Sequence, residues 1–232
     1  MWSFLKFKNS QLNCLTAIKS GCIVHNNENL RFLTLTSSSD MNRSITKCFS
    51  VLVNRIERLY PLKFVELGLI KRNKLNYYYP NTDSNKNLHF DYLYVLTSEG
   101  VNGVLHVLYF GDFIHEKWLK DNWEEITGGA RQLIIEKVGN DLQNKEKLSK
   151  YMVNQRKLFG YVTSQCKYIR HSYSKNWVYK GWRKDFKHIL KVCYSQRYSK
   201  FLKNDLWHIW YAWLLYGRYV RPTIQLCLKD YI

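Results

Sequence analysis

The sequence predicts an α+β fold in which one antiparallel sheet carries helices on one of its faces. Segments with alternating apolar residues, typical of strands, are separated by segments whose apolar residues recur every three to four positions, as in amphipathic helices. Two of the strand-like segments flank a turn at residues 100–103 that contains Gly and Asn, which predicts a hairpin. The chain has 232 residues, enough for a buried core together with an appendage or a second small domain.

The first half of the chain predicts a strand followed by a long helix. Residues 31–36 alternate and are rich in apolar and β-branched types, which is typical of a strand. Apolar residues repeat at helical spacing over 45–59, and we expect Pro61 to end this helix. Residues 64–67 are expected to add a short strand, and the polar segment 71–88 to form an insertion loop.

The second half predicts a hairpin, a helix, a strand and a further helix. Residues 90–97 and 104–110 are the two arms of the hairpin, and a helix over 119–126 is closed by two glycines. A further strand covers 133–138 and another helix covers 148–159. When the short strand at 64–67 is left out, the order is β-α-β-β-α-β followed by a helix. This is the split βαβ or ferredoxin-like arrangement, with its helices on one face of the antiparallel sheet.

We divide the chain into three parts. Residues 1–29 form an N-terminal extension, residues 30–160 form the sheet domain, and residues 161–232 contain a basic, aromatic segment followed by a C-terminal helical extension. Within the last part, apolar and aromatic residues between 201 and 216 predict a helix that packs back on the core.

The charge and the aromatic content favour a nucleic-acid partner. The chain carries 36 Lys and Arg against 18 Asp and Glu, a formal net charge of +18, which suits a polyanion, with an anionic membrane as the second choice. Its 18 Tyr, 11 Phe and 8 Trp suit stacking on unpaired bases of single-stranded DNA. The alternative is that Trp and Tyr fill the core while Lys covers the surface. No apolar run approaches the roughly 20 residues of a membrane span, so we expect no membrane-spanning segment, and we choose nucleic acid, not a membrane, as the partner.

The cysteines indicate a reducing compartment. No two of the six form a CxxC pair, so their spacing predicts neither a disulfide framework nor a zinc site. We therefore expect an intracellular location, in the cytoplasm or in an organelle matrix or stroma. Residues 1–27 contain lysines and no acidic residue, similar to an organellar transit segment, but they lack Arg.

A segment at 161–195 interleaves cations with aromatic rings, which favours a DNA-contacting surface. An aromatic layer packed beneath a basic face is an equally good interpretation of the same pattern. The candidate DNA contacts in this segment are Lys167, Arg170, Lys175, Trp177, Trp182 and Arg183.

Three motifs, taken in order, resemble the HUH rolling-circle replication initiators. Residues 32–36, FLTLT, resemble the opening motif of that superfamily, and the hairpin from Glu99 to His106 resembles its metal-binding motif. Residues 147–155, KLSKYMVNQ, resemble its nucleophile helix. The similarity is to the replication-associated proteins of plasmids and phages and covers residues 30–186.

The resemblance implies a DNA-nicking and strand-joining enzyme that initiates rolling-circle replication of a plasmid, phage or similar element. In this superfamily a tyrosine hydroxyl attacks a DNA phosphate, leaving a 5′-phosphotyrosine and a free 3′-OH. A divalent ion, here expected to be Mg²⁺ or Mn²⁺, balances charge in the transition state. The implied partners are single-stranded DNA and a helicase or the host replication machinery. The implied residues are Tyr151 as nucleophile with Tyr161 as its backup, His106 and Glu99 as metal ligands, and Lys150 and Gln155 as DNA contacts.

One departure from the family pattern concerns the metal motif. The motif has two histidines flanking an apolar residue, whereas Val104-Leu105-His106 keeps only the second, so Glu99 or a water must replace the missing imidazole. By pattern alone, His106 fits a structural role on a strand and Tyr151 fits core packing equally well. Two other functions therefore stay open: a catalytically lapsed DNA-binding protein on the same fold, and an RNA-binding domain that uses the same sheet.

Overall fold

The computed structural model describes most of the sheet domain and short parts of the rest of the chain. The described residues are 30–39, 41–97, 103–130, 132–137 and 170–184, with 13–14, 17–18, 20–22, 24–25 and 187. The chain forms two units. One contains His25–Gln165 and Arg170–Trp177; the other contains Met1–Val24, Cys166–Ile169 and Val178–Ile232. Residues 170–177 thus belong to the sheet unit, although the sequence groups them with the C-terminal part.

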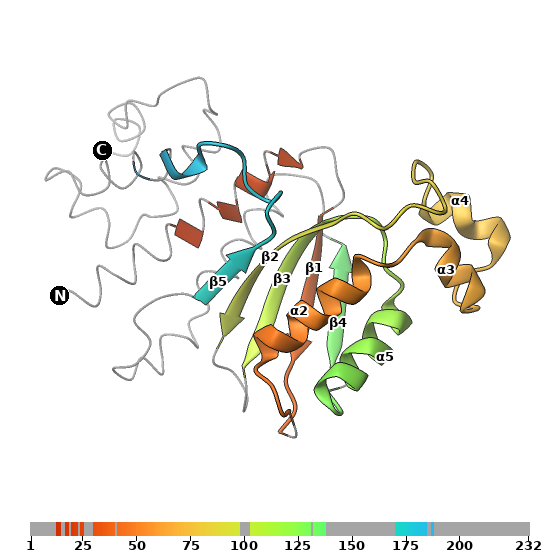
Figure 1. The fold of residues 1–232 in the computed structure, drawn as a ribbon, viewed down its shortest axis with the longest axis horizontal. Helices are drawn as coiled ribbons and strands as arrows, with labels where there is room; N and C mark the ends of the chain where they lie inside the picture. Colours follow the sequence, from red (N-terminus) through yellow and green to blue (C-terminus); the bar gives the residue numbers. More distant parts are fainter. Residues whose placement is uncertain are drawn as a thin grey trace, which may run out of the picture. The chain divides into compact units, whose positions relative to one another are not determined.

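A five-stranded antiparallel sheet forms the larger unit (Figure 1). Its strands follow the order β4-β1-β3-β2-β5, and every neighbouring pair is antiparallel. The strands are β1 (Leu30–Thr36), β2 (Phe90–Thr97), β3 (Val104–Gly111), β4 (Leu133–Lys137) and β5 (Arg170–Tyr173). The α+β class and the four predicted sheet strands are confirmed, and the two hairpin arms are neighbours. The sequence did not predict β5.

The hairpin between β2 and β3 requires a glycine where β3 begins. Gly103 has a φ of 86°, a left-handed conformation that side chains disfavour. A Cβ at this position would lie 2.6 Å from the carbonyl oxygen of Thr97, so the two backbones approach too closely for any larger residue. This turn sets the register in which Thr97 lies opposite Val104 and Val95 lies opposite His106.

Helices α2 (Ile45–Ile56) and α5 (Glu116–Thr127) cover one face of the sheet (Figure 1). Gly128, with a φ of 71°, ends α5 as the sequence predicts. The indole N–H of Trp123 donates to the carbonyl oxygen of Thr36 at 2.9 Å and ties α5 to the end of β1. The core beneath the helices contains Leu33, Leu35, Leu105, Val107 and Tyr109 from the sheet and Phe49, Leu52, Ile56, Leu119 and Trp123 from the helices.

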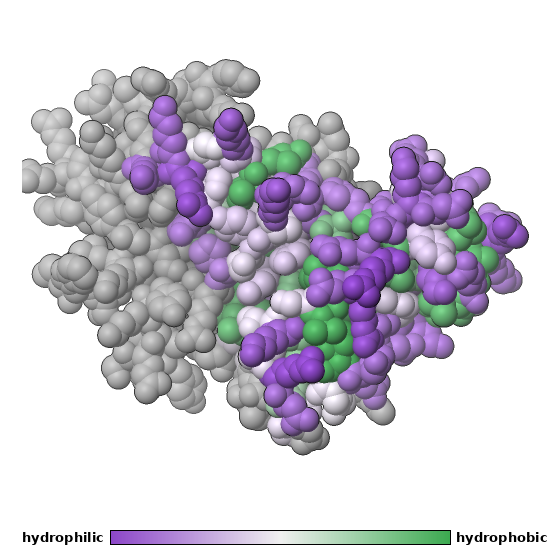
Figure 2. Space-filling view, in the orientation of Figure 1, coloured by the Kyte–Doolittle hydropathy of each residue, from purple (hydrophilic) through white to green (hydrophobic). Residues whose placement is uncertain are grey.

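The outer surface of this helical layer is mainly hydrophilic, and apolar side chains show between α2 and α5 (Figure 2). Such a distribution is expected for amphipathic helices that bury one side against a sheet. Among the described residues, no helix is both long and apolar enough to cross a membrane.

Two predictions between α2 and β2 are wrong. Residues 61–66 form helix α3 (Pro61–Glu66) in place of the short strand expected at 64–67, because Pro61 occupies the first turn, where its fixed φ favours a helix. The expected loop at 71–88 contains a 3₁₀ turn, η1 (Arg72–Lys74), and a short helix, α4 (Leu75–Tyr78). Tyr79 is buried after α4, and its hydroxyl donates to the carbonyl oxygen of Phe113 at 2.6 Å. The helices predicted at 148–159 and 201–216 lie outside the described residues.

In the smaller unit, the described residues include an N-terminal part and residues 178–184. The backbone N–H of Tyr179 donates to the hydroxyl of Ser20 at 2.8 Å, which joins these two parts. The described cysteines of the whole chain, Cys14, Cys22 and Cys48, are free thiols.

Candidate functional site

The sheet face opposite α2 and α5 carries the polar residues of interest. Side chains alternate along a strand, so His106 in β3 points away from Leu105 and Val107, which pack beneath the helices. Thr34 lies opposite His106 in the β1–β3 register and shares this face with it. In the sequence, Thr34 alternates with Leu33 and Leu35, which agrees with its position on the face opposite those leucines.

His106 is buried on this face, near the hairpin end of β3. Only 2% of the residue is exposed, and its Nδ1 lies 3.3 Å from the Thr34 hydroxyl. The ring of Phe32 stacks on its imidazole, with the centroids 5.6 Å apart and the planes 4° from parallel. Burial disfavours the charged imidazolium and lowers the pKa of His106 from 6.5 to about 4. His106 is therefore neutral at pH 7, which is the form that can bind a metal, but its ring is enclosed.

Several residues predicted from the sequence lie outside the described residues, so their distances to His106 are not defined. These are Glu99, Lys150, Tyr151, Gln155, Tyr161 and Lys167. Arg170 is the first residue of β5, and Lys175 and Arg183 are exposed, as DNA contacts must be.

The two tryptophans predicted to stack on DNA bases are buried. Trp177 is completely inaccessible and packs 5.4 Å from the ring of Phe110, centroid to centroid. Trp182 is 8% exposed, and the guanidinium of Arg183 lies 5.8 Å from its ring centroid. Neither ring presents a free face for a base in this structure. The aromatic layer beneath a basic face, which was the alternative interpretation of this segment, describes Trp177 better.

A second polar group lies elsewhere on the same sheet face. Among the described residues, His25, His89 and Asp91 form a group whose ligand atoms all lie within 4.8 Å of one another, so that it could hold a metal ion. Asp91 belongs to β2, His89 directly precedes that strand, and His25 precedes β1. We call this group the His-His-Asp cluster.

The carboxylate of Asp91 is the centre of this cluster. Its Oδ2 lies 2.5 Å from Nε2 of His89 and 3.9 Å from Nε2 of His25, while the hydroxyl of Ser174 donates to Oδ1 at 2.7 Å. The side chains of His25 and Asp91 are only 4% and 5% exposed, whereas that of His89 is 45% exposed. The cluster is therefore enclosed on the His25 side and open to solvent at His89.

Opposing effects act on the pKa of Asp91. Burial raises this pKa, but hydrogen bonds from His89 and Ser174 and the neighbouring imidazoles lower it by a larger amount, so the net shift is downward. Asp91 is therefore ionised at neutral pH although it is almost fully buried. A buried carboxylate of this kind needs a compensating positive charge, which a protonated imidazole or a cation can supply.

The His-His-Asp cluster and His106 lie at different ends of the sheet face. Asp91 lies opposite Phe110 in the β2–β3 register, and Phe110 is four residues beyond His106 along β3. At about 3.3 Å per residue this corresponds to roughly 13 Å. The cluster also lies at the opposite end of β2 and β3 from the predicted Glu99–His106 hairpin, so His106 does not belong to it.

The sequence did not predict the His-His-Asp cluster. One part of the cluster could have been predicted from the sequence. In His89-Phe90-Asp91 the two polar residues are two positions apart, which places them on one side of an extended chain. The contributions of His25 and Ser174 were not readable, because both lie far from β2 in the sequence and reach Asp91 only through the fold.

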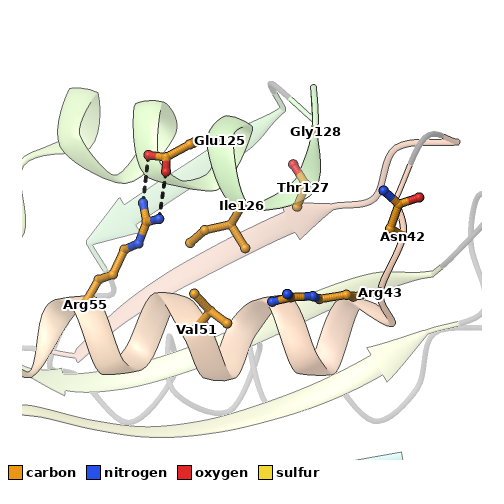
Figure 3. Close-up of a pocket in the computed structure, with 8 residues that line it drawn as sticks. All are labelled: Asn42, Arg43, Val51, Arg55, Glu125, Ile126, Thr127 and Gly128. Atoms are coloured by element: carbon orange, nitrogen blue, oxygen red, sulfur yellow. Dashed lines mark hydrogen bonds and ion pairs between the residues drawn. The ribbon is translucent and has the colours of Figure 1, made fainter.

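A shallow hollow of about 390 Å³ lies on the opposite, helical side of the sheet unit (Figure 3). It lies between α2 and the C-terminal end of α5, with Arg43 and Thr127 on its margin. Arg55 is occupied there by a bidentate ion pair with Glu125, with both N–O distances at 2.8 Å, and by a hydrogen bond to Asn122 at 2.7 Å. The hollow is therefore the groove between two packed helices, and the guanidinium of Arg55 in it is already paired with Glu125.

Comparison with known proteins finds no matching family model, no similar curated protein and no similar solved structure. The interpretation of function therefore depends on the sequence motifs and on the geometry described above.

Proposed function

We propose that the protein is a metal-dependent DNA-nicking and strand-joining protein of the HUH type, which initiates rolling-circle replication of a plasmid, phage or similar element. The observation that carries the proposal is the position of His106 on β3, a central strand, on the sheet face away from α2 and α5. The order β4-β1-β3-β2, with α2 connecting β1 to β2 and α5 connecting β3 to β4, also supports the ferredoxin-like split βαβ arrangement.

In this proposal, His106 and Glu99 hold Mg²⁺ or Mn²⁺. His106 fits a metal ligand because it is neutral, and its neighbour Thr34 holds one ring nitrogen within hydrogen-bonding distance, which orients the imidazole. A bound divalent ion supplies charge stabilisation to the phosphoryl group that is cleaved. Tyr151 provides the attacking hydroxyl, whose pKa near 10 makes it a weak nucleophile without such help.

Single-stranded DNA is the proposed substrate. The formal charge of +18 supports binding to a polyanion, and the exposed Lys175 and Arg183 are available for phosphate contacts. The burial of Trp177 and Trp182 makes phosphate contacts, rather than base stacking on these two rings, the proposed basis of binding.

A second function, a catalytically lapsed DNA-binding protein on the same fold, is favoured by one specific observation. His106 is 2% exposed beneath Phe32, and Val104 occupies the place of the missing first histidine. An enclosed single imidazole fits a structural role if no metal reaches it.

The two functions are separated by formation of a covalent DNA adduct. Labelled single-stranded DNA is incubated with the full chain and Mn²⁺, and protein-bound label is measured after denaturation. We expect an adduct with the wild type and with Tyr161→Phe, and none with Tyr151→Phe, which should still bind DNA because only one oxygen is removed. An adduct that persists in Tyr151→Phe but is lost in Tyr161→Phe identifies Tyr161 as the nucleophile. The absence of any adduct from the wild type contradicts nicking and supports the lapsed function.

A further inference from the structure

We propose that the His-His-Asp cluster is a zinc site, in which His25, His89 and Asp91 bind one Zn²⁺. The ion would join two separate segments of the sheet unit, the residues before β1 and the start of β2. Ser174, in the turn after β5, would hold Asp91 in place through its hydrogen bond. It is distinct from the nicking site, which the preceding proposal places around His106, and it does not depend on that proposal.

The donor set indicates the metal. Two imidazole nitrogens and one carboxylate oxygen suit Zn²⁺ and related transition metals, whereas Mg²⁺ and Ca²⁺ prefer oxygen ligands throughout. Zn–N and Zn–O bonds of about 2.0–2.2 Å place tetrahedral ligand atoms roughly 3.3 Å apart. The observed separations of 2.5 Å (His89 to Asp91) and 3.9 Å (His25 to Asp91) lie on either side of this value. All three ligand atoms lie within 4.8 Å of one another, so side-chain adjustments of roughly 1–1.5 Å would bring them to this spacing.

The surroundings hold the ligands in place as they do in established metal sites. Ser174 donates to Oδ1 of Asp91, which leaves Oδ2 directed at the two imidazoles. The ring of Phe110 stacks on that of His25 with the centroids 5.0 Å apart, and Trp177 lies 6.1 Å from it on the same measure. Hydrogen bonds to the carboxylate and an apolar shell around the imidazole are the outer contacts that orient metal ligands.

Exposure and charge are also consistent with a zinc site. His89 is 45% exposed, so an ion can enter from that side, and a fourth coordination position is open to water there. The carboxylate of Asp91 is only 5% exposed, and a divalent cation held between it and the two imidazoles would supply the positive charge that a buried carboxylate needs.

Zinc binding by the full-length chain tests the proposal. The protein is treated with a chelator, dialysed and titrated with Zn²⁺ by calorimetry, and Co²⁺ is added separately to record the absorption bands of tetrahedral coordination. We expect one Zn²⁺ per chain. We expect His89→Gln to weaken binding at least about 100-fold, and Ser174→Ala to weaken it about 10- to 100-fold through the loss of its hydrogen bond to Asp91.

The controls separate this site from other histidines and from unfolding. His115→Gln should bind Zn²⁺ as the wild type does, because His115 does not belong to the cluster. His89 is partly exposed, so His89→Gln should remain folded, which circular dichroism verifies. The proposal is wrong if the wild type binds no Zn²⁺, or if a folded His89→Gln variant binds it as tightly as the wild type. The proposal would also be wrong if Zn²⁺ binding were lost in His106→Gln and kept in His89→Gln, because the metal would then lie at the nicking site.

Discussion

Acidification should destabilise the protein through His106. In the folded state the pKa of His106 is about 4, because burial disfavours the imidazolium, whereas an unfolded histidine has a pKa of 6.5. Between these two values the unfolded chain binds more protons than the folded one. The stabilisation is therefore complete above pH 6.5 and is lost as the pH falls toward 4.

The magnitude follows from the two pKa values. A shift of one unit corresponds to 1.36 kcal/mol, and integrating the difference in protonation between pH 7.5 and pH 4.5 gives a loss of about 2.5 kcal/mol from this residue. This is a large part of the 5–15 kcal/mol by which a typical domain is stable. His106→Leu keeps an apolar side chain beside Phe32 and removes the titrating group.

Urea denaturation at several pH values measures the effect. The free energy of unfolding of the wild type should fall by about 2.5 kcal/mol more than that of His106→Leu over this pH range, because the other titrating groups are common to both proteins. Equal pH dependence in the two proteins would refute the reasoning. It would show that His106 is accessible to protons in the folded state, and hence is less enclosed than its 2% exposure indicates.

Two further predictions concern DNA binding and the hairpin. The affinity for a single-stranded oligonucleotide, measured by fluorescence anisotropy, should fall steeply as the salt concentration rises. Lys175→Ala and Arg183→Ala should each reduce the slope of log affinity against log salt by about 1 if the replaced residue contacts a phosphate. An affinity that does not depend on salt would contradict binding through phosphates. Gly103→Ala should lower the free energy of unfolding by more than the roughly 1 kcal/mol typical of a point mutation, since its Cβ would lie 2.6 Å from the Thr97 carbonyl oxygen. Gly129→Ala is the control, because Gly129 also has a positive φ but a Cβ there would lie in open space. If the two variants unfold at the same low temperature, the close approach to Thr97 is not the cause of the destabilisation.

Most strands and helices of the sheet unit could be predicted from the sequence, because the pattern of apolar residues that marks each of them lies within a short segment. Alternation over β1 and helical spacing over α2 each predict one element, and both elements are confirmed. The error at α3 arose because a short apolar run fits a strand and a helix equally well, and Pro61, interpreted as a stop, instead begins the helix. Strand β5 was missed because its four residues are basic, polar and aromatic, and only pairing with β2 makes them a strand.

The site was less readable than the fold. The sequence motif proposed His106 as a metal ligand, and that role stays a prediction, because burial decides what each side chain can contact. Trp177 illustrates this limit: within an interleaved run of rings and cations it resembles a stacking platform, yet it is completely buried against Phe110. Periodicity reports which residues share a face, and it does not report what covers that face.

The sequence by itself determined the class of fold, the strands of the hairpin and the excess of positive charge, because periodicity, turn residues and net charge are properties of neighbouring residues and of composition. Only the tertiary structure decided that His106 is neutral, since its pKa depends on enclosure by Phe32 and other parts of the fold. Only the tertiary structure brought His25 and Ser174 to Asp91. Hydrogen bonds and ring contacts act only over a few ångströms. Residues so far apart in the chain come within that distance only through the packing of the whole sheet.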